Sequence, residues 1–185
     1  MEISYTDITI ALGISEVLLA IVKRSKNRQV KSKVDKSSML MLWLCIGGGL
    51  FLGGFFSGII KAVLPGWIQK TGVLLIIVGF IIRWVAILQL GKMFTVDVSI
   101  SREHRLKTNG LYGAVRHPSY LGLLLILLGT GLLTGNAVSL IIVFLPSLIA
   151  LIYRMQVEES ALLAEFGSEY LNYKNKVARV IPGIY

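Results

Sequence analysis

Residues 104–120 combine several side chains that can bind a small polar ligand with the expected start of a helix. Both histidines of the chain, His104 and His117, lie in this stretch, and an apolar segment follows it. Because Pro118 disfavours a helical backbone at His117 and suits the first turn of a helix, we expect a helix to begin close to Pro118. A helix start carries unpaired N–H groups and the positive end of the helix dipole, so an anionic group of a ligand could bind there.

A second candidate pair, Arg154 and Glu158, follows the last apolar segment. Four residues of spacing place both side chains on one face of a continuous helix, where they can touch. They form either an ordinary surface salt bridge, worth about 0.3–0.5 kcal/mol, or part of a binding site. The planar guanidinium of arginine suits recognition of a carboxylate. From these residues alone both interpretations stay open.

Other familiar chemistries are not indicated. The sequence has no G-x-x-x-x-G-K-[ST] phosphate loop, no G-x-S-x-G serine nucleophile and no dinucleotide-binding glycine turn after a strand. Two histidines without a cysteine cluster do not indicate a zinc site, so we expect no metal. Arg83 lies inside an apolar segment, so its cation must reach the interface, pair with an acid or line a polar cavity.

The elements that position these residues should be membrane helices. Apolar residues make up 55% of the chain, and the mean hydropathy is +0.74. A helix needs about 20 apolar residues to cross a bilayer, somewhat fewer inside a bundle. Five segments qualify: Ile3–Val22, Met39–Ile60, Thr71–Leu90, Leu121–Leu133 (extendable to Pro118) and Ala137–Tyr153. We therefore predict an all-α fold, an integral membrane bundle of about five transmembrane helices with a cytoplasmic C-terminal helical segment.

Finer patterns predict how this bundle packs and ends. Gly49/Gly53 and Gly54/Gly58 have the spacing of small residues that lets membrane helices approach closely. The helix over 157–166 should continue the fifth span and stop at Gly167. Ser168 should then cap a second helix, with buried contacts expected at Tyr170, Leu171 and Val177, and at Tyr173 as a further candidate.

Basic residues orient the predicted bundle. The loop over 23–36 carries seven lysines and arginines against Asp35 alone, whereas the following loop offers only Lys61 and Lys70. The positive-inside rule then places the N-terminus outside, and the segment 91–120 and the C-terminus in the cytoplasm. Anionic membrane lipids at the cytoplasmic face account for the net charge of +9 without a nucleic acid partner.

Several motifs, in this order and spacing, resemble the isoprenylcysteine carboxyl methyltransferase family and, more broadly, the membrane phospholipid N-methyltransferases. They are Leu90-Gly-Lys-Met-Phe-Thr-Val96, Thr108-Asn-Gly-Leu-Tyr112, Arg116-His-Pro-Ser-Tyr-Leu-Gly122, Glu158-Glu-Ser-Ala-Leu162 and Phe166-Gly-Ser-Glu-Tyr-Leu-Asn-Tyr-Lys174. The resemblance covers about residues 75–182. Residues 1–70 match only in being apolar, and 1–185 is read as a single membrane domain.

The resemblance implies that S-adenosylmethionine binds in a cytoplasmic pocket of the C-terminal half. By matched position, its contacts would be His104, Leu106, Lys107, Tyr112, His117, Pro118, Ser119 and Tyr120. Arg154 and Glu158 match the family's substrate-side pair and would be the catalytic residues. Lys107 stands where eukaryotic members usually have valine, which fits a contact through the backbone. A further polar contact before His104 cannot be placed, because 97–103 is shorter than in eukaryotic relatives.

The expected function is therefore methyl transfer from S-adenosylmethionine to a lipophilic or lipidated acceptor, foremost a carboxylate of the isoprenylcysteine type. Phospholipid amines and thiols are alternative acceptors. A membrane reductase using NADPH is a second hypothesis, against which stands the lack of a basic cluster for a dinucleotide phosphate. A non-catalytic membrane protein is the third. The identity of the acceptor and the oligomeric state stay open.

Overall fold

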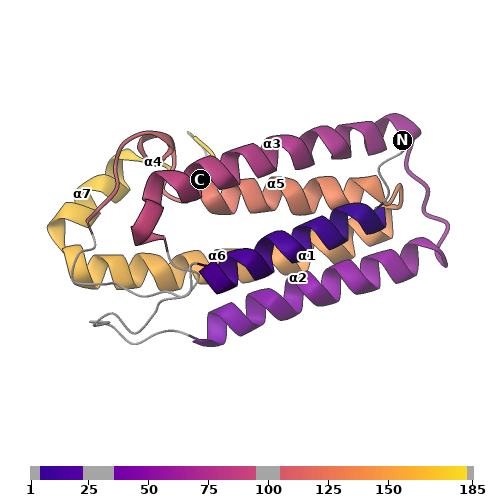
Figure 1. Ribbon diagram of the computed structural model, residues 1–185, viewed down its shortest axis with the longest axis horizontal. Helices are drawn as coiled ribbons and strands as arrows, with labels where there is room; N and C mark the ends of the chain where they lie inside the picture. Colours follow the sequence, from indigo (N-terminus) through magenta and orange to yellow (C-terminus); the bar gives the residue numbers. More distant parts are fainter. Residues whose placement is uncertain (1–4, 23–35, 95–104, 183–185) are drawn as a thin grey trace.

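The computed structural model describes residues 5–22, 36–94 and 105–182, which are mostly helical (Figure 1). Its five long helices are α1 (Tyr5–Val22), α2 (Lys36–Ser57), α3 (Gly66–Leu90), α5 (Pro118–Leu133) and α6 (Ala137–Phe166). Three short elements complete it: η1 (Gly91–Met93), α4 (Leu111–Ala114) and α7 (Ser168–Lys176). In these described residues β-structure is limited to two isolated bridges.

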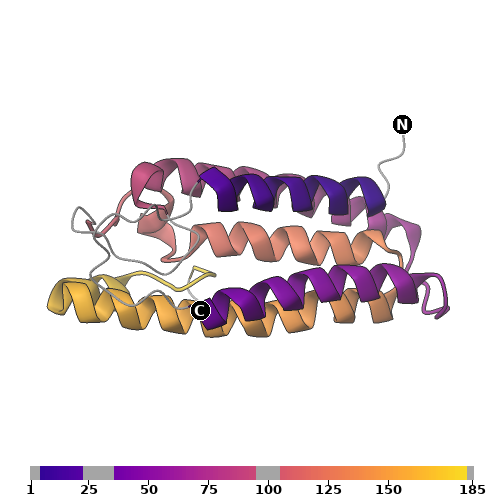
Figure 2. The same ribbon diagram turned by 60° about the horizontal axis from the view of Figure 1, so that its bottom comes forward.

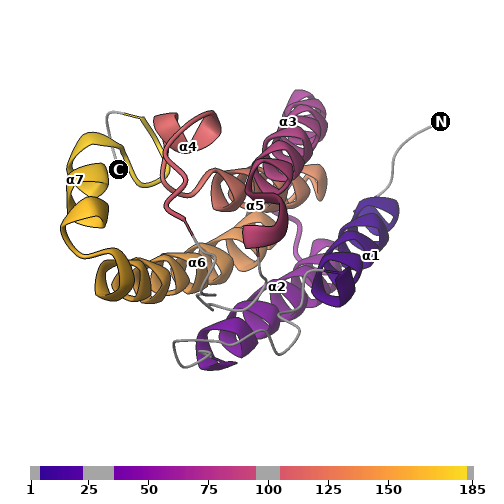
Figure 3. The ribbon, with the colours of Figure 1, turned by 60° about the vertical axis from the view of Figure 1, so that its left-hand side comes forward.

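The long helices lie side by side, and the short ones gather at one end of the bundle (Figures 1 and 2). α3 packs along α5, α2 packs along α6, and contact between α5 and α6 joins the two pairs. α4 and α7 lie at the end of the bundle where α5 begins and α6 ends (Figure 3). Segments that carry the predicted functional residues are therefore neighbours in space.

The helical structure confirms the predicted all-α membrane bundle. By length and composition α2, α3 and α6 can cross a membrane, and α5 is a shorter apolar helix. α6 has 30 residues. At about 1.5 Å per residue this exceeds the roughly 30 Å of bilayer hydrocarbon. Its last turns therefore extend past the apolar layer, beside α4 and α7.

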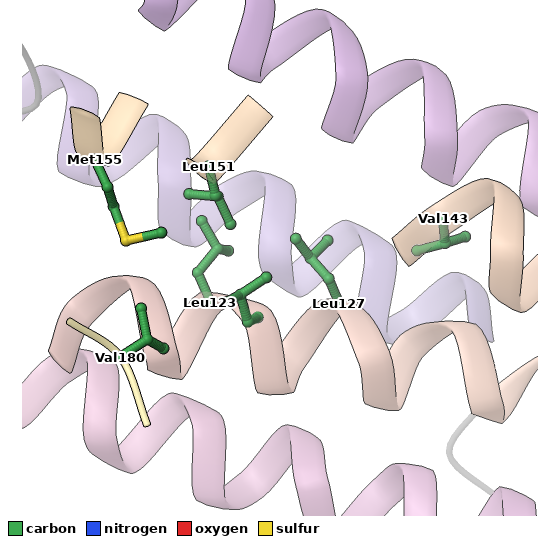
Figure 4. Packing of buried hydrophobic residues seen from close by; sticks show 7 residues of the cluster. Leu123, Leu127, Val143, Leu151, Met155 and Val180 are labelled. Carbon is green, nitrogen blue, oxygen red and sulfur yellow. The ribbon is translucent and has the colours of Figure 1, made fainter. Parts of the chain in front are cut away.

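The core between α5 and α6 also includes the segment that follows α7. Leu123 and Leu127 of α5 pack with Leu151 and Met155 of α6, and Val180 joins the same cluster (Figure 4). Each of these five side chains is buried. The segment 177–180 is therefore packed against the bundle, and Val180 is its buried anchor.

Glycines bring α3 and α5 into backbone contact. A Cβ atom built on Gly79 would lie 2.6 Å from the carbonyl oxygen of Gly122, and one on Gly122 would lie 2.6 Å from that of Gly79. Gly72 and Gly129 face each other in the same way one heptad further along. Only residues without a side chain allow this approach, which fixes where α5 starts relative to α3.

In α2 the predicted packing of small residues holds for one pair and fails for the other. Gly49 and Gly53 face the backbone and side chains of α6 around Val143. Gly54 contacts the ring of Tyr5 in α1, but a Cβ at Gly58 would meet nothing nearer than the Phe55 carbonyl of its own segment. The reason is that α2 ends at Ser57, so Gly58 is not on the helix face that the pattern assumed.

Substitution of Gly122 by alanine should destabilise the fold by about 1–3 kcal/mol, because the added methyl group must push α3 and α5 apart. Gly47→Ala is the matched control, since a Cβ at Gly47 meets nothing within 4 Å. Thermal unfolding of both variants in detergent measures the difference. Equal stability of the two variants would contradict this contact between α3 and α5.

The helix boundaries confirm several predicted signals and correct one. α5 begins at Pro118, and α6 runs to Phe166 and ends at Gly167, whose φ of 53° suits glycine. The predicted cap at Ser168 is wrong: Ser168 is the first residue of α7, and Gly167 occupies the capping position without a side-chain bond. Because one glycine both ends α6 and starts α7, no residue is left over to act as a cap.

The expected burial in α7 is right for two of its residues. Tyr170 and Tyr173 are buried, but Leu171 is 47% exposed, which contradicts the prediction for that residue. Leu171 directly follows Tyr170 in the helix Ser168–Lys176, so it points away from the face that Tyr170 and Tyr173 share.

Candidate functional site

The buried carboxylate of Glu159, near the end of α6, is the centre of a polar cluster. Its oxygens lie 3.1 Å from Nη2 of Arg116, 3.2 Å from Nε2 of His117 and 2.8 Å from Nη2 of Arg179. Nζ of Lys174 lies 3.6 Å away. A buried charge is tolerated only with such partners. Through this one side chain, the start of α5, α7 and the segment after α7 are tied to α6.

Backbone pairing holds the entrance to α5 in place. The N–H of Arg116 donates to the carbonyl of Ala178 at 2.8 Å, and the N–H of His117 donates to that of Arg179 at 3.0 Å. Val115 and Ala178 form a parallel bridge in the same register. Residues 115–117 therefore stay extended up to Pro118, as the residue before a proline prefers.

A second network of hydrogen bonds connects three helices and includes the predicted Arg154 and Glu158. The Tyr120 hydroxyl donates to Oε2 of Glu158 at 2.8 Å and accepts from Nε of Arg154 at 3.1 Å. Nη1 of Arg154 donates to Oγ of Ser38 in α2 at 3.1 Å. Arg154 is 4% exposed, so its environment is not that of an ordinary surface salt bridge.

His117 connects the two clusters. Its Nε2 lies 3.2 Å from Oε1 of Glu159, and its Nδ1 lies 3.9 Å from Oε2 of Glu158. The imidazole also stacks on the ring of Tyr120, with centroids 5.5 Å apart. The adjacent acids differ in setting, because the Glu158 side chain is 34% exposed whereas that of Glu159 is buried. Glu158 is thus the carboxylate that a ligand can reach.

A third set of contacts ties the same region to α3. Nη1 of Arg83 donates to both the carbonyl and the hydroxyl oxygen of Ser119 at 3.2 Å. The Tyr112 hydroxyl donates to the carbonyl of Ala86 at 3.3 Å. Arg83, left open between several roles by the sequence, therefore contacts the first turn of α5. Ser119 and Tyr112 face α3 rather than Glu158.

Two buried tyrosines of α7, Tyr170 and Tyr173, also lie at this end of the bundle. The Tyr173 hydroxyl donates to the carbonyl of Tyr112 at 2.5 Å. Burial raises the pKa of Tyr173 to about 12, although the Arg116 cation opposes the shift, so the hydroxyl stays protonated and can donate. The Tyr170 hydroxyl is buried and makes no hydrogen bond to the described residues. It is therefore a polar group that a ligand could satisfy.

Most of the predicted site residues lie at this end of the bundle, on two sides of α5. Tyr120 links the other three predicted residues, because it stacks on His117 and hydrogen-bonds to both Arg154 and Glu158. Pro118 is buried as the first residue of α5, and Leu106 and Lys107 are half-buried in the segment before α4. His104 lies outside the described residues.

Sequence reasoning gave no site role to five residues of these clusters, namely Ser38, Arg116, Glu159, Lys174 and Arg179. Glu159 is adjacent to the predicted Glu158, but a step of about 100° around the helix directs it to other partners. Arg116 was part of the quoted motif and received no role. Arg179 and Ser38 carry no local signal, because each reaches the site from a distant part of the chain: Arg179 contacts a residue 20 positions away and Ser38 one 116 positions away.

Comparison with known proteins gives a consistent match. A sequence model of the isoprenylcysteine carboxyl methyltransferase (ICMT) family matches residues 72–164. Protein-S-isoprenylcysteine O-methyltransferase B of Arabidopsis thaliana is 36% identical over 172 residues, covering 91% of this chain and 86% of that protein. The A protein of the same plant is 36% identical over 118 residues, covering 63% of this chain and 60% of that protein.

The fold is similar as well. A solved structure of the eukaryotic intramembrane Ras methyltransferase ICMT aligns with a TM-score of 0.66 at 27% identity. That alignment covers 97% of this chain and 65% of the other. The chain therefore spans somewhat less than two thirds of that structure and of the A protein of Arabidopsis thaliana.

Proposed function

The chain belongs to the isoprenylcysteine carboxyl methyltransferase family, and we propose that it is an S-adenosylmethionine-dependent membrane enzyme that methylates a carboxylate on a lipophilic acceptor of the isoprenylcysteine type. The observation that carries this proposal is the buried Arg154, held by Tyr120 and Ser38 next to the accessible Glu158. A fixed planar cation at the membrane boundary suits a carboxylate whose lipid part stays in the bilayer.

The residues at this end of the bundle fit the proposed cofactor. When bound, S-adenosylmethionine supplies an electrophilic methyl group on a sulfonium cation. The accessible carboxylate of Glu158 offers a counter-charge, and the buried Tyr170 hydroxyl offers a hydrogen bond. His117 and Tyr120 would hold the cofactor directly. Ser119 and Tyr112, which face α3, would contribute through the backbone or by keeping α5 in place.

Methylation of a carboxylate demands little proton chemistry from the protein. An acceptor carboxylate is already an anion at neutral pH, so no general base is required. The main requirement is orientation at near-attack distance, which can supply a large part of the acceleration. Arg154 would hold the carboxylate by charge-assisted hydrogen bonds, while Ser38 and Tyr120, itself bonded to Glu158, hold Arg154. Burial around Arg154 excludes water that would weaken these contacts.

Direct binding and transfer test the proposed function. Protein in lipid nanodiscs should bind S-adenosylmethionine, and not NADPH, in calorimetric titrations. With methyl-labelled cofactor it should transfer label to an S-prenylated N-acetylcysteine, and not to the corresponding carboxamide. Binding of NADPH alone would favour the reductase. Transfer to phospholipid amines, with the prenylated acid left unmodified, would favour the amine alternative.

Alanine at His117 or Tyr120 should weaken binding of S-adenosylmethionine by about 1–3 kcal/mol each, because a buried polar contact is lost. Calorimetry on the purified variants measures the change. Tyr153→Ala is the control, since Tyr153 lies on α6 with 43% of its surface exposed. If both variants bind S-adenosylmethionine as tightly as Tyr153→Ala does, residues 116–120 do not contact the cofactor and only start α5.

We further propose that the N-terminus lies outside and that the site faces the cytoplasm, following the basic loops. In a Cys45→Ser background, Lys61→Cys and Lys176→Cys place single exposed thiols at opposite ends of the bundle. An impermeant thiol reagent added to intact cells should label the thiol at position 61 and spare the one at position 176. The reverse pattern would invert the orientation, and equal labelling would contradict a membrane-spanning bundle.

A further inference from the structure

α2 contributes to the site through Ser38, although the match to the family model begins only at residue 72. Ser38 lies in the first turn of α2, and its side chain is 0% exposed. Its hydroxyl accepts a hydrogen bond from Nη1 of Arg154 at 3.1 Å, across 116 residues of sequence. The region with no family motif therefore touches the residue proposed to hold the acceptor.

Two hydrogen bonds to different helices fix the plane of the Arg154 guanidinium. Nε donates to Tyr120 of α5, and Nη1 donates to Ser38 of α2. A guanidinium held at one nitrogen can still turn about that contact, whereas two anchors on opposite helices set both its position and its tilt. Tilt matters here because a planar fork binds a carboxylate in only a narrow range of directions.

Ser147 provides a comparison, because its hydroxyl bonds within its own helix. Ser147 of α6 is also fully buried, and its Oγ donates to the carbonyl of Val143 one turn earlier in the same helix at 2.8 Å. The Ser38 hydroxyl instead accepts from a cation on another helix. Hydrogen bonds to charged groups are the stronger class, so the two serines should respond differently to removal of the hydroxyl.

We propose that Ser38 is a positioning residue of the acceptor site, which orients Arg154 for the acceptor carboxylate and makes the start of α2 part of substrate recognition. This inference rests on the proposed function. The acceptor carboxylate carries its full charge before transfer and loses it as the new C–O bond forms and the C–S bond of the sulfonium breaks. A loosened Arg154 should therefore affect acceptor binding more than the transfer step.

Ser38→Ala and Ser147→Ala, measured side by side, test the proposal. In Ser38→Ala the KM for the prenylated acceptor should rise about tenfold, as expected for loss of a hydrogen bond to a charged group. Its kcat and its Kd for S-adenosylmethionine should stay near the wild-type values. Ser147→Ala should leave all three quantities unchanged. The unchanged cofactor affinity also verifies that the variant is folded.

The outcomes separate this inference from the proposed function. A Ser38→Ala protein that matches Ser147→Ala in acceptor KM overturns the role of Ser38 alone. A fall in kcat at unchanged KM overturns it as well. Absence of methyl transfer by the wild-type protein overturns the proposed function and this inference together. If Ser38→Ala does not fold, Ser38→Cys fills the site with a slightly larger side chain that is a weaker acceptor. It should still raise KM, and a wild-type KM would reject the proposal.

Discussion

Replacement of Glu159 by glutamine should disrupt the site more than any other single change, with a loss of stability of about 3–5 kcal/mol. The amide keeps the shape but removes the charge that faces Arg116, His117 and Arg179. Lys174 is 40% exposed and should contribute little to this loss. The buried guanidinium of Arg116 would be left without its carboxylate, so the start of α5 should detach from α6.

The effect can be measured by thermal unfolding in detergent and by calorimetric titration with S-adenosylmethionine. We expect a large drop in unfolding temperature and loss of detectable cofactor binding. Glu158→Gln is the matched comparison, because it alters the neighbouring, accessible acid. It should keep most of the stability and impair transfer instead. A Glu159→Gln protein as stable as the wild type would show that the cluster does not hold these segments together.

Arg154→Lys is the second large effect, expected on catalysis rather than on folding. Lysine keeps the charge but cannot donate to Tyr120 and Ser38 from two fixed nitrogens. With two charge-assisted contacts altered, kcat/KM for the acceptor should fall about a hundredfold, while cofactor affinity stays near normal. Arg105→Lys, at an exposed position, is the control and should behave as wild type.

Steady-state transfer of labelled methyl groups measures this change. Near-wild-type turnover in Arg154→Lys would remove the carboxylate clamp from the mechanism. An amine or thiol acceptor handled through Glu158 would then become the better explanation. A loss of cofactor affinity equal to the loss of kcat/KM would place Arg154 on the cofactor side of the site.

The helices could be predicted because their causes are local. Apolar length predicted the five long helices, Pro118 marked the start of α5, and Gly167 marked the end of α6. The family resemblance, which rested on motifs in order, is confirmed by the match over 72–164. The exception at Gly58 shows the limit: small-residue spacing has no meaning once the helix has ended.

The contacts inside the site were harder to predict from the sequence, because they depend on how the helices pack against one another. The four-residue spacing placed Arg154 and Glu158 on one face, but the phenol of Tyr120 between them comes from the packing of α5 against α6. The importance of Glu159 follows from burial, which the sequence does not state. Pairing of 115–117 with 178–179 involves two short extended segments that have no periodicity to detect.

That pairing has a consequence for biosynthesis. The two segments are separated by about 60 residues, since Val115 pairs with Ala178. At roughly 5–20 residues per second, the ribosome makes the second segment about 3–12 s after the first. During this interval α5 and α6 can enter the membrane while Arg116 and His117 still lack their backbone partners. Chains that stall before residue 178 would therefore reach the bilayer with an unassembled site, and their unpaired strand would be open to chaperones and proteases.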